Sequence, residues 1–544
     1  MKNYIILSFI RKIYSGIFPV LLFAAPILAQ TNDKKEDWRN YNRTYEGDRY
    51  SPLKQITPAN VGKLRLLHTF DLGKDVSSMQ TGPVVIDGTM YFTTDTVTYA
   101  IDASTGDLIW RRVRPVQNPV GYGANRGVAY SDGKLFRGAS DAHVFALNAK
   151  DGEIIWDVPL DVAGPGVSIP MAPLAWNGML FIGNAGGDNA GVTGHMYALD
   201  VNDGHMIWEF NTVPDNGPAR ETWPAANNGV PVSGGAIWTS VSLDTKNGVL
   251  YIPAGNPAPD FDIALRENGE ELYSNCVIAL DSKTGRMLGY IQLVKKDNHD
   301  WDVSSAPVVI VTKGGKQIIA SANKNGLLSV LDRSAIALNS DVIDPSGTLK
   351  LLYEVPTTVR ENTDIPLSRE KFVRFKPGIL GGSEWNGSAY HPGLDLIYTG
   401  TNDWATAVKL LPTDSARMTP AQGGYYFGGA MQFDPPSEAR GWVTAFNAKD
   451  GSERWKYQSP APILAGVTPT AGGLVFTAAQ NGDVYALDAQ NGKLLWHAST
   501  DLPNGGGVIS YSVKGKQYIA VAAGMKAPLW PKPSNASRIF IYGL

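Results

Sequence analysis

Residues 100–110 read AIDASTGDLIW, and the chain repeats this pattern several times. Four further stretches keep the same order of Ala, one residue, Asp or Asn, three residues, Gly, three residues and Trp. They are residues 146–156, 198–208, 445–455 and 486–496. A sixth copy, residues 279–289 (ALDSKTGRMLG), ends without the Trp. Repetition on this scale predicts a fold that is assembled from similar units.

Each copy of the pattern predicts a β-hairpin. The Ala-Leu-Asp end is expected to form a short inner strand, and the Gly supplies the positive φ of a tight turn. The Trp then lies at a fixed place on the face of the second strand. One hairpin cannot bury that ring, but sheets stacked around an axis can, and they leave few exposed edges. We therefore predict an all-β fold, a β-propeller with tryptophan-docking repeats. Unrelated hairpins in a β-sandwich are the alternative.

The N-terminal segment is typical of a secretory signal peptide. Residues 1–30 contain Lys2, Arg11 and Lys12, followed by a short apolar run that ends in PILAQ. An uncleaved anchor is the alternative, although no later stretch is apolar enough for stable insertion into a membrane. Residues 31–544 are then one propeller domain, expected in the periplasm. Cleavage makes the formal net charge of −3 three units more negative, which argues against a nucleic-acid partner.

Other parts of the chain give more local expectations. Residues 318–332, 397–402 and 475–479 are predicted as strands, and residues 245–256 as a hairpin that turns at 246–248. The polar, proline-containing residues 339–378 are expected to leave the sheets, and residues 538–542 to pair with the N-terminal strand. Cys276 is the only cysteine, so the sequence predicts no internal disulfide and no CxxCH haem site. Electrons would need a separate carrier.

Three parts of the sequence together resemble the PQQ-dependent alcohol dehydrogenases: residues 37–73, the repeated pattern, and the closing stretches 472–496 and 515–524. The similarity extends from about residue 38 to residue 524. It implies an eight-bladed propeller with pyrroloquinoline quinone (PQQ) on its axis beside a metal ion, usually Ca²⁺. It also implies a periplasmic enzyme that oxidises a small-molecule alcohol to an aldehyde or ketone. Electrons would pass to a separate acceptor such as a cytochrome c.

The resemblance implies three metal ligands. Asn256 lies in LYIPAGNPAPD, and Asp302, which is also the expected catalytic base, lies in NHDWDVSS. The family's first ligand is a Glu; in this chain Asp188 is preferred for that role, with Asn189 as the gap-free alternative. Ser304 stands where lanthanide-using members have a second Asp, which favours calcium. Bound Ca²⁺ would act as a Lewis acid.

The remaining implied residues surround the cofactor. Lys324, in KNGLLSVLDR, would stabilise negative charge on the quinone during catalysis. Arg126 would bind a PQQ carboxylate, and Trp238 would lie flat under the quinone ring. Asn386, in SEWNGSAY, is expected near the cofactor, and Gln80 stands where many members have a cofactor-contacting Glu.

Two other functions are compatible with the same repeats. One is a quinoprotein that acts on sugars or polyols, and the other is a non-catalytic propeller scaffold. The joint presence of Asn256, Asp302, Lys324 and Arg126 argues against the scaffold. A membrane-embedded N-terminal region would support the sugar enzyme, and the sequence predicts none beyond residues 1–30.

Overall fold

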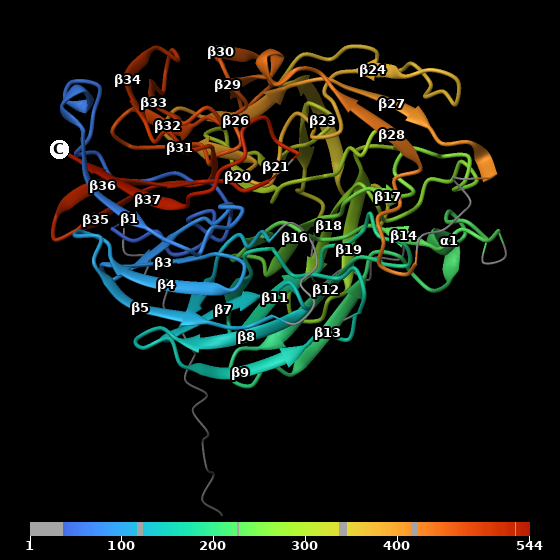
Figure 1. The fold of residues 1–544 in the computed structure, drawn as a ribbon, viewed down its shortest axis with the longest axis horizontal. Coiled ribbons are helices and arrows are strands. Elements are labelled where there is room, and N and C mark those ends of the chain that lie inside the picture. Colours follow the sequence, from blue (N-terminus) through green and yellow to red (C-terminus); the bar gives the residue numbers. More distant parts are fainter. Residues whose placement is uncertain are drawn as a thin grey trace, which may run out of the picture. The chain divides into compact units, whose positions relative to one another are not determined.

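The computed structural model describes residues 36–116, 123–162, 164–225, 228–336, 345–414, 421–527 and 529–544 (Figure 1). The predicted signal peptide, residues 1–30, lies outside the described residues. The described residues belong to one compact unit. No helix in the described part is long and apolar enough to cross a membrane.

The described residues form eight four-stranded antiparallel sheets, numbered here in chain order. Sheets 1 to 3 consist of consecutive strands. Sheet 1 contains β2 (Val84–Ile86), β3 (Thr89–Thr93), β4 (Val97–Asp102) and β5 (Leu108–Val113). Sheet 2 contains β6 (Ala129–Ser131), β7 (Lys134–Gly138), β8 (His143–Asn148) and β9 (Ile154–Pro159). Sheet 3 contains β10 (Leu174–Trp176), β11 (Met179–Gly183), β12 (His195–Asp200) and β13 (Met206–Asn211).

In sheets 4 and 6 other strands come between members of the sheet along the chain, whereas sheet 5 is again consecutive. Sheet 4 contains β15 (Ser242–Asp244), β16 (Val249–Pro253), β18 (Cys276–Asp281) and β19 (Met287–Gln292). Sheet 5 contains β20 (Val308–Val311), β21 (Gln317–Ala322), β22 (Leu327–Asp332) and β23 (Lys350–Pro356). Sheet 6 contains β25 (Ser388–His391), β26 (Leu396–Asp403), β29 (Arg440–Asn447) and β30 (Glu453–Ser459).

The last two sheets bring the two ends of the described chain together. Sheet 7 contains β31 (Thr468–Pro469), β32 (Leu474–Ala478), β33 (Asp483–Asp488) and β34 (Leu494–Ser499). Sheet 8 contains β35 (Asn504–Val513), β36 (Lys516–Ala523), β37 (Arg538–Gly543) and β1 (Arg65–Asp71). The pairing of β1 with β37 confirms the predicted closing strand.

Smaller elements lie between the sheets. They are the pair β14 (Ser233–Gly234) and β17 (Pro257–Ala258), the three strands β24 (Val373–Phe375), β27 (Thr406–Leu410) and β28 (Gly429–Phe433), and the short helices η1 (Val61–Lys63), α1 (Gly217–Arg220) and η2 (Pro436–Glu438).

The eight sheets form a closed ring, as Figure 1 shows from β3–β5 (blue) round to β35–β37 (red). Apolar clusters join every sheet to the next in chain order, and another cluster joins sheet 8 to sheet 1. First strands of several neighbouring sheets contact one another, among them β6 with β10, β15 with β20 and β25 with β31, so the first strands lie nearest the axis. The predicted β-propeller is confirmed, and the number of four-stranded sheets equals the expected eight blades.

The repeated Trp docks on the following sheet. Trp110, in sheet 1, donates its indole N–H to the carbonyl oxygen of Ala149 in sheet 2 at 3.0 Å. A Cβ on Gly152 would lie 2.6 Å from Cε3 of Trp110, so only glycine fits beneath the ring. A glycine of the next sheet lies beneath the indole ring in the same way at three other copies: Trp156, Trp208 and Trp455. The Gly of the pattern therefore serves both the turn and the contact between sheets.

The Ala-Leu-Asp strand is the third strand of its sheet and lies inside the outermost strand, which carries the Trp, as the predicted hairpin requires. One prediction about this part of the chain was wrong. Residues 339–378 were expected to leave the sheets, but β23 completes sheet 5 and β24 pairs with β27. In sheet 5 Tyr353 replaces the Trp, and its hydroxyl donates to the carbonyl oxygen of Ala448 at 2.9 Å. Because this aromatic residue does not follow the repeat pattern, the sequence concealed the fourth strand.

Candidate active site

A cavity of about 270 Å³ lies where loops from different sheets meet. Its walls include residues from the loops after β11, β16, β19 and β21, which follow one another around the ring. Seven residues that the sequence predicted for the site line this cavity: Gln80, Arg126, Asp188, Trp238, Asn256, Asp302 and Lys324. The alternative metal ligand Asn189 also lines it. Ring closure therefore brings together residues that are far apart in the sequence.

Asp302 is buried, and three donors orient its carboxylate. Oδ1 accepts hydrogen bonds from the indole N–H of Trp238 at 3.2 Å and from the backbone N–H of Asn256 at 3.0 Å. Oδ2 accepts a hydrogen bond from Nζ of Lys324 at 3.0 Å. An ionised carboxylate offers about four acceptor positions, so about one position remains for a further proton donor.

Lys324 forms the cationic centre of the cavity. Its Nζ also donates to Oδ1 of Asp300 at 2.8 Å. Burial by itself would lower the pKa of Lys324, but Asp300 and Asp302 together raise this pKa well above its ordinary value. The ammonium group therefore stays protonated at neutral pH, between two carboxylates.

Arg126 and two tryptophans form the aromatic side of the cavity. The guanidinium carbon of Arg126 lies 4.8 Å from the ring centre of Trp238 and 5.2 Å from that of Trp385. Nη1 of Arg126 donates to the carbonyl oxygen of Trp238 at 3.0 Å, while Nε has no partner among the described residues. Burial lowers the pKa of Arg126 to about 10, so the group remains a cation at neutral pH. A buried cation with an unused donor is suited to binding an anion.

Three carboxylates gather at one part of the cavity. One oxygen each from Asp188, Asp260 and Asp300 lies within 4.8 Å of the other two. Burial raises the pKa of all three carboxyl groups, and repulsion between the carboxylates raises it further. Oxygen atoms in this number and spacing suit a hard cation.

Asn386 lies next to Trp385 in the chain but is not itself among the described residues that line the cavity. Its amide is engaged by the protein. Its Oδ1 accepts hydrogen bonds from Tyr41 Oη and Arg49 Nη2, both at 2.9 Å. Its Nδ2 donates to the carbonyl oxygen of Leu464 at 2.6 Å. Asn386 therefore supports the loop from which Trp385 reaches the cavity.

Comparison with known proteins explains this constellation. The family model described as "Glucose/ethanol/alcohol dehydrogenase, beta-propeller domain" matches residues 38–335, which is more than half of the chain. The chain belongs to the PQQ-dependent alcohol dehydrogenase family. A second model, described as "Outer membrane protein assembly factor BamB", matches residues 439–530. These residues contain two copies of the repeat pattern.

Individual members of the PQQ-dependent alcohol dehydrogenase family match along most of the chain. The dehydrogenase subunit of alcohol dehydrogenase (quinone) from Gluconacetobacter polyoxogenes is 30% identical, over 91% of this chain and 72% of that protein. Quinoprotein ethanol dehydrogenase from Pseudomonas aeruginosa is 29% identical, over 92% of this chain and 88% of that protein. The solved structure of quinohemoprotein alcohol dehydrogenase ADHIIG from Pseudomonas putida HK5 superimposes with a TM-score of 0.83. That pair is 25% identical, over 94% of this chain and 81% of the other.

Several of the residues that line the cavity were not predicted from the sequence. Asp260, Asp300 and Glu384 lie in stretches that carry the resemblance, beside the residues that were chosen. Burial raises the pKa of Glu384 to about 8. The apolar wall comes largely from residues outside the repeats, so periodicity could not reveal it. It consists of Ile379, Leu380, Tyr425, Phe427, Met431, Leu529 and Trp530.

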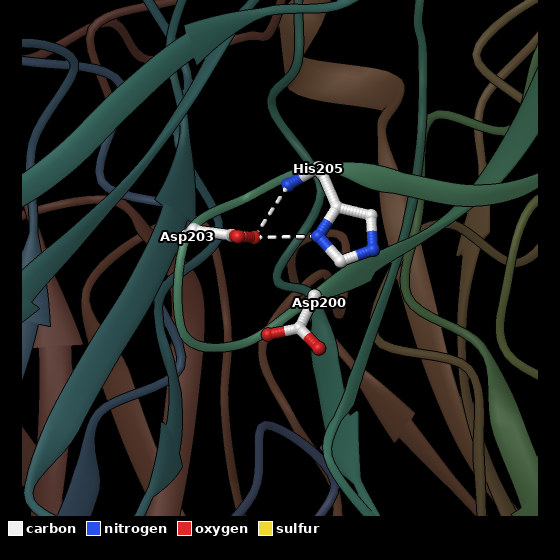
Figure 2. Close-up of side chains that lie close together, drawn as sticks. All are labelled: Asp200, Asp203 and His205. Carbon is white, nitrogen blue, oxygen red and sulfur yellow. Dashed lines mark hydrogen bonds and ion pairs between the residues drawn. The ribbon is translucent and has the colours of Figure 1, made fainter.

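A second group of possible metal ligands lies on the surface. Figure 2 shows Asp200, Asp203 and His205 at the turn between β12 and β13. Oδ1 of Asp203 accepts hydrogen bonds from the backbone N–H of His205 at 3.0 Å and from its Nδ1 at 2.7 Å. Oδ1 of Asp200 accepts a hydrogen bond from the backbone N–H of Asn202 at 2.7 Å. Turn formation accounts for these contacts, whereas in the buried group neither oxygen of Asp260 has a partner among the described residues.

Proposed function

We propose that the protein oxidises a small-molecule alcohol to an aldehyde or ketone, with PQQ as its cofactor and Ca²⁺ as its metal ion. Membership of the family supports PQQ-dependent alcohol oxidation. The single observation that carries the proposal is the convergence of Asp302, Lys324, Arg126 and Trp238 on one cavity. An interaction scaffold has no need for a buried, hydrogen-bonded array of this kind.

The lining residues fit the proposed cofactor. PQQ is planar and carries three carboxylates, so it needs aromatic surfaces together with cations and amides. Trp238 and Trp385 offer such surfaces, and Arg126 offers a buried guanidinium with an unused N–H. Gln80 adds an amide whose Oε1 has no partner among the described residues. When bound, PQQ supplies the two-electron oxidant that the alcohol carbon requires.

Asp302 is the residue best placed to take the hydroxyl proton of the alcohol. Its three donors hold the carboxylate in one orientation, and about one acceptor position stays open. Lys324 remains a cation beside it and would stabilise negative charge that develops in the cavity. Because both side chains are buried, water competes weakly for the proton.

The apolar wall favours simple alcohols over sugars. Ile379, Leu380, Phe427 and Met431 offer a surface for a hydrocarbon chain or ring. A polyol placed there would leave several hydroxyls without partners, at a cost of about 1–3 kcal/mol for each one. We therefore keep sugars and polyols as the second candidate class.

The periplasm and a separate electron acceptor, such as a cytochrome c, complete the proposal. The signal-like residues 1–30 support the location. A single cysteine cannot form a CxxCH motif, so this sequence has no covalent c-type haem of its own.

Reconstitution tests the proposed function. The purified protein, loaded with PQQ and Ca²⁺, should reduce an artificial dye when ethanol or 1-butanol is added. Glycerol and glucose should give a much smaller kcat/KM than 1-butanol. Greater activity with the polyols would favour the sugar or polyol enzyme. No dye reduction at saturating cofactor, across a broad panel of alcohols, would favour the scaffold.

A further inference from the structure

Asp260 is a fully buried carboxylate without a partner. Its exposed fraction is 0%, and no described residue donates a hydrogen bond to either of its oxygens. A buried charge in this state costs several kcal/mol unless a counter-charge accompanies it. One oxygen of Asp260 lies within 4.8 Å of oxygens from Asp188 and Asp300. The nearby carboxylates make the cost larger, so a bound cation would stabilise the ionised form of this group.

The described cations do not meet this requirement. Nζ of Lys324 contacts Asp300 and Asp302, at 2.8 and 3.0 Å, but no hydrogen bond joins it to Asp260. Arg369 binds Asp262, two residues from Asp260 in the chain, at 2.6 Å. Asp260 and Asp188 therefore have no protein counter-ion in contact among the described residues.

Asp302 is less suitable as a ligand than the resemblance implies. Both of its oxygens already accept hydrogen bonds, from Trp238, Asn256 and Lys324. Binding a cation through either oxygen would bring the metal toward these donors. Lys324 also contacts Asp300, at 2.8 Å, but only through Oδ1, so no described residue donates a hydrogen bond to Oδ2 of Asp300.

We infer that Asp188, Asp260 and Asp300 together hold the metal ion, and that Asp302 remains outside its ligand set. This inference rests on the proposed function only for the choice of Ca²⁺ as the ion. The three side chains come from separate loops: one between β11 and β12, one after β17, and one between β19 and β20. Three carboxylates around one point match the preference of Ca²⁺ for oxygen ligands. Asp302 then keeps its free acceptor position for the substrate.

Calcium binding to the full-length protein without PQQ tests the inference. After removal of bound metal, isothermal titration calorimetry should show that one Ca²⁺ binds to each protein molecule. Asp260→Asn should weaken the Ca²⁺ affinity by about tenfold or more, because one charged ligand is lost. Asp302→Asn should weaken this affinity less than Asp260→Asn does, since a residue outside the ligand set acts on the metal only indirectly. Asp203→Asn, in the surface group of Figure 2, is the matched control and should bind like the wild type.

A stability measurement separates ligand loss from misfolding. Without Ca²⁺, Asp260→Asn should melt at the same temperature as the wild type or higher, because it removes an unpaired buried charge. Added Ca²⁺ should raise the Tm of the wild type and of Asp302→Asn, but not that of Asp260→Asn. Asp260→Glu, which keeps the charge, should recover part of the response.

Two results would overturn the inference: wild-type Ca²⁺ affinity in Asp260→Asn, or an equal loss of affinity in Asp302→Asn. Both readouts are independent of PQQ and of turnover. An Asp260-dependent calcium site in a protein that oxidises no alcohol would thus refute the proposed function alone. If the protein reduces the dye but its Ca²⁺ affinity does not depend on Asp260, only this inference is refuted.

Discussion

Nζ of Lys324 lies 3.0 Å from Oδ2 of Asp302, and both side chains are buried. The pair joins a loop between β21 and β22 to the loop between β19 and β20. The same ammonium group also contacts Asp300, so one cation fixes two carboxylates. This arrangement makes Lys324 the residue on which both the charge balance and the geometry of the cavity depend.

Replacing Lys324 by Met should affect both stability and activity. The substitution leaves Asp300 and Asp302 as buried carboxylates without their cation, which costs about 3–5 kcal/mol of unfolding free energy. Loss of the charge should also lower kcat by about 10²–10³-fold. Denaturant titration and dye reduction measure the two effects. Lys324→Arg keeps the charge and should recover much of the stability; a Met variant as stable as the wild type would contradict the prediction.

Asp302→Asn should separate catalysis from folding. The amide oxygen can still accept hydrogen bonds from Trp238 and Asn256, and Lys324 keeps its contact with Asp300. The unfolding free energy should therefore change by less than about 1 kcal/mol. Without a proton acceptor, kcat should fall by about 10²–10⁴-fold. Residual activity within about tenfold of the wild type would show that another group is the base.

The tryptophan docking can be tested with two glycines in similar turns. Gly152 has a φ of +73° and lies under Trp110, whereas Gly133 has a φ of +77° and nothing within 4 Å of its Cβ position. Gly133→Ala should cost only the positive-φ strain, about 1–2 kcal/mol. Gly152→Ala should lower the unfolding free energy by about 1–3 kcal/mol more than Gly133→Ala does, because the new methyl group meets the indole ring. Equal losses, measured by denaturant unfolding, would show that the ring moves aside freely.

Asp48 gives a pH dependence that is independent of the cavity. Its Oδ1 accepts hydrogen bonds from Thr44 Oγ1 at 3.0 Å and from the backbone N–H of Tyr50 at 3.1 Å. Burial raises the pKa of Asp48 from 3.8 to about 6, although Arg43 partly opposes the shift. The folded state therefore binds the proton more tightly than the unfolded state. The contribution of this tighter proton binding to the unfolding free energy is fully present below about pH 4. It is lost as the pH rises through about 6.

Asp48→Asn should remove this dependence, because the amide stays neutral. Above pH of about 7 the variant should be more stable than the wild type by about 1–2 kcal/mol. At pH of about 4 the two proteins should differ much less. Denaturant titrations at several pH values measure the difference. The assigned pKa shift would be contradicted if the wild type gained stability relative to Asp48→Asn as the pH rises from about 4 to about 7.

The repeats and motifs of the sequence were sufficient for the fold and for much of the cavity. The spacing from Ala100 to Trp110 encodes a hairpin and a docking ring, and both are local properties of the chain. Stacking then follows because each Trp needs a neighbouring sheet to cover it. The family motifs around Asp302 and Lys324 also indicated residues that share one cavity.

Only the tertiary structure decided how the loops meet. The approach of Asp260 to Asp188 and Asp300, and the hydrogen bonds that turn Asn386 toward Tyr41, depend on closure of the ring. The same is true of Gly152, whose turn the sequence indicates but whose contact with Trp110 it does not. Local patterns determine hairpins because neighbouring residues interact whatever the rest of the chain does. Contacts between distant loops depend on the register of every sheet between them, which no short stretch encodes.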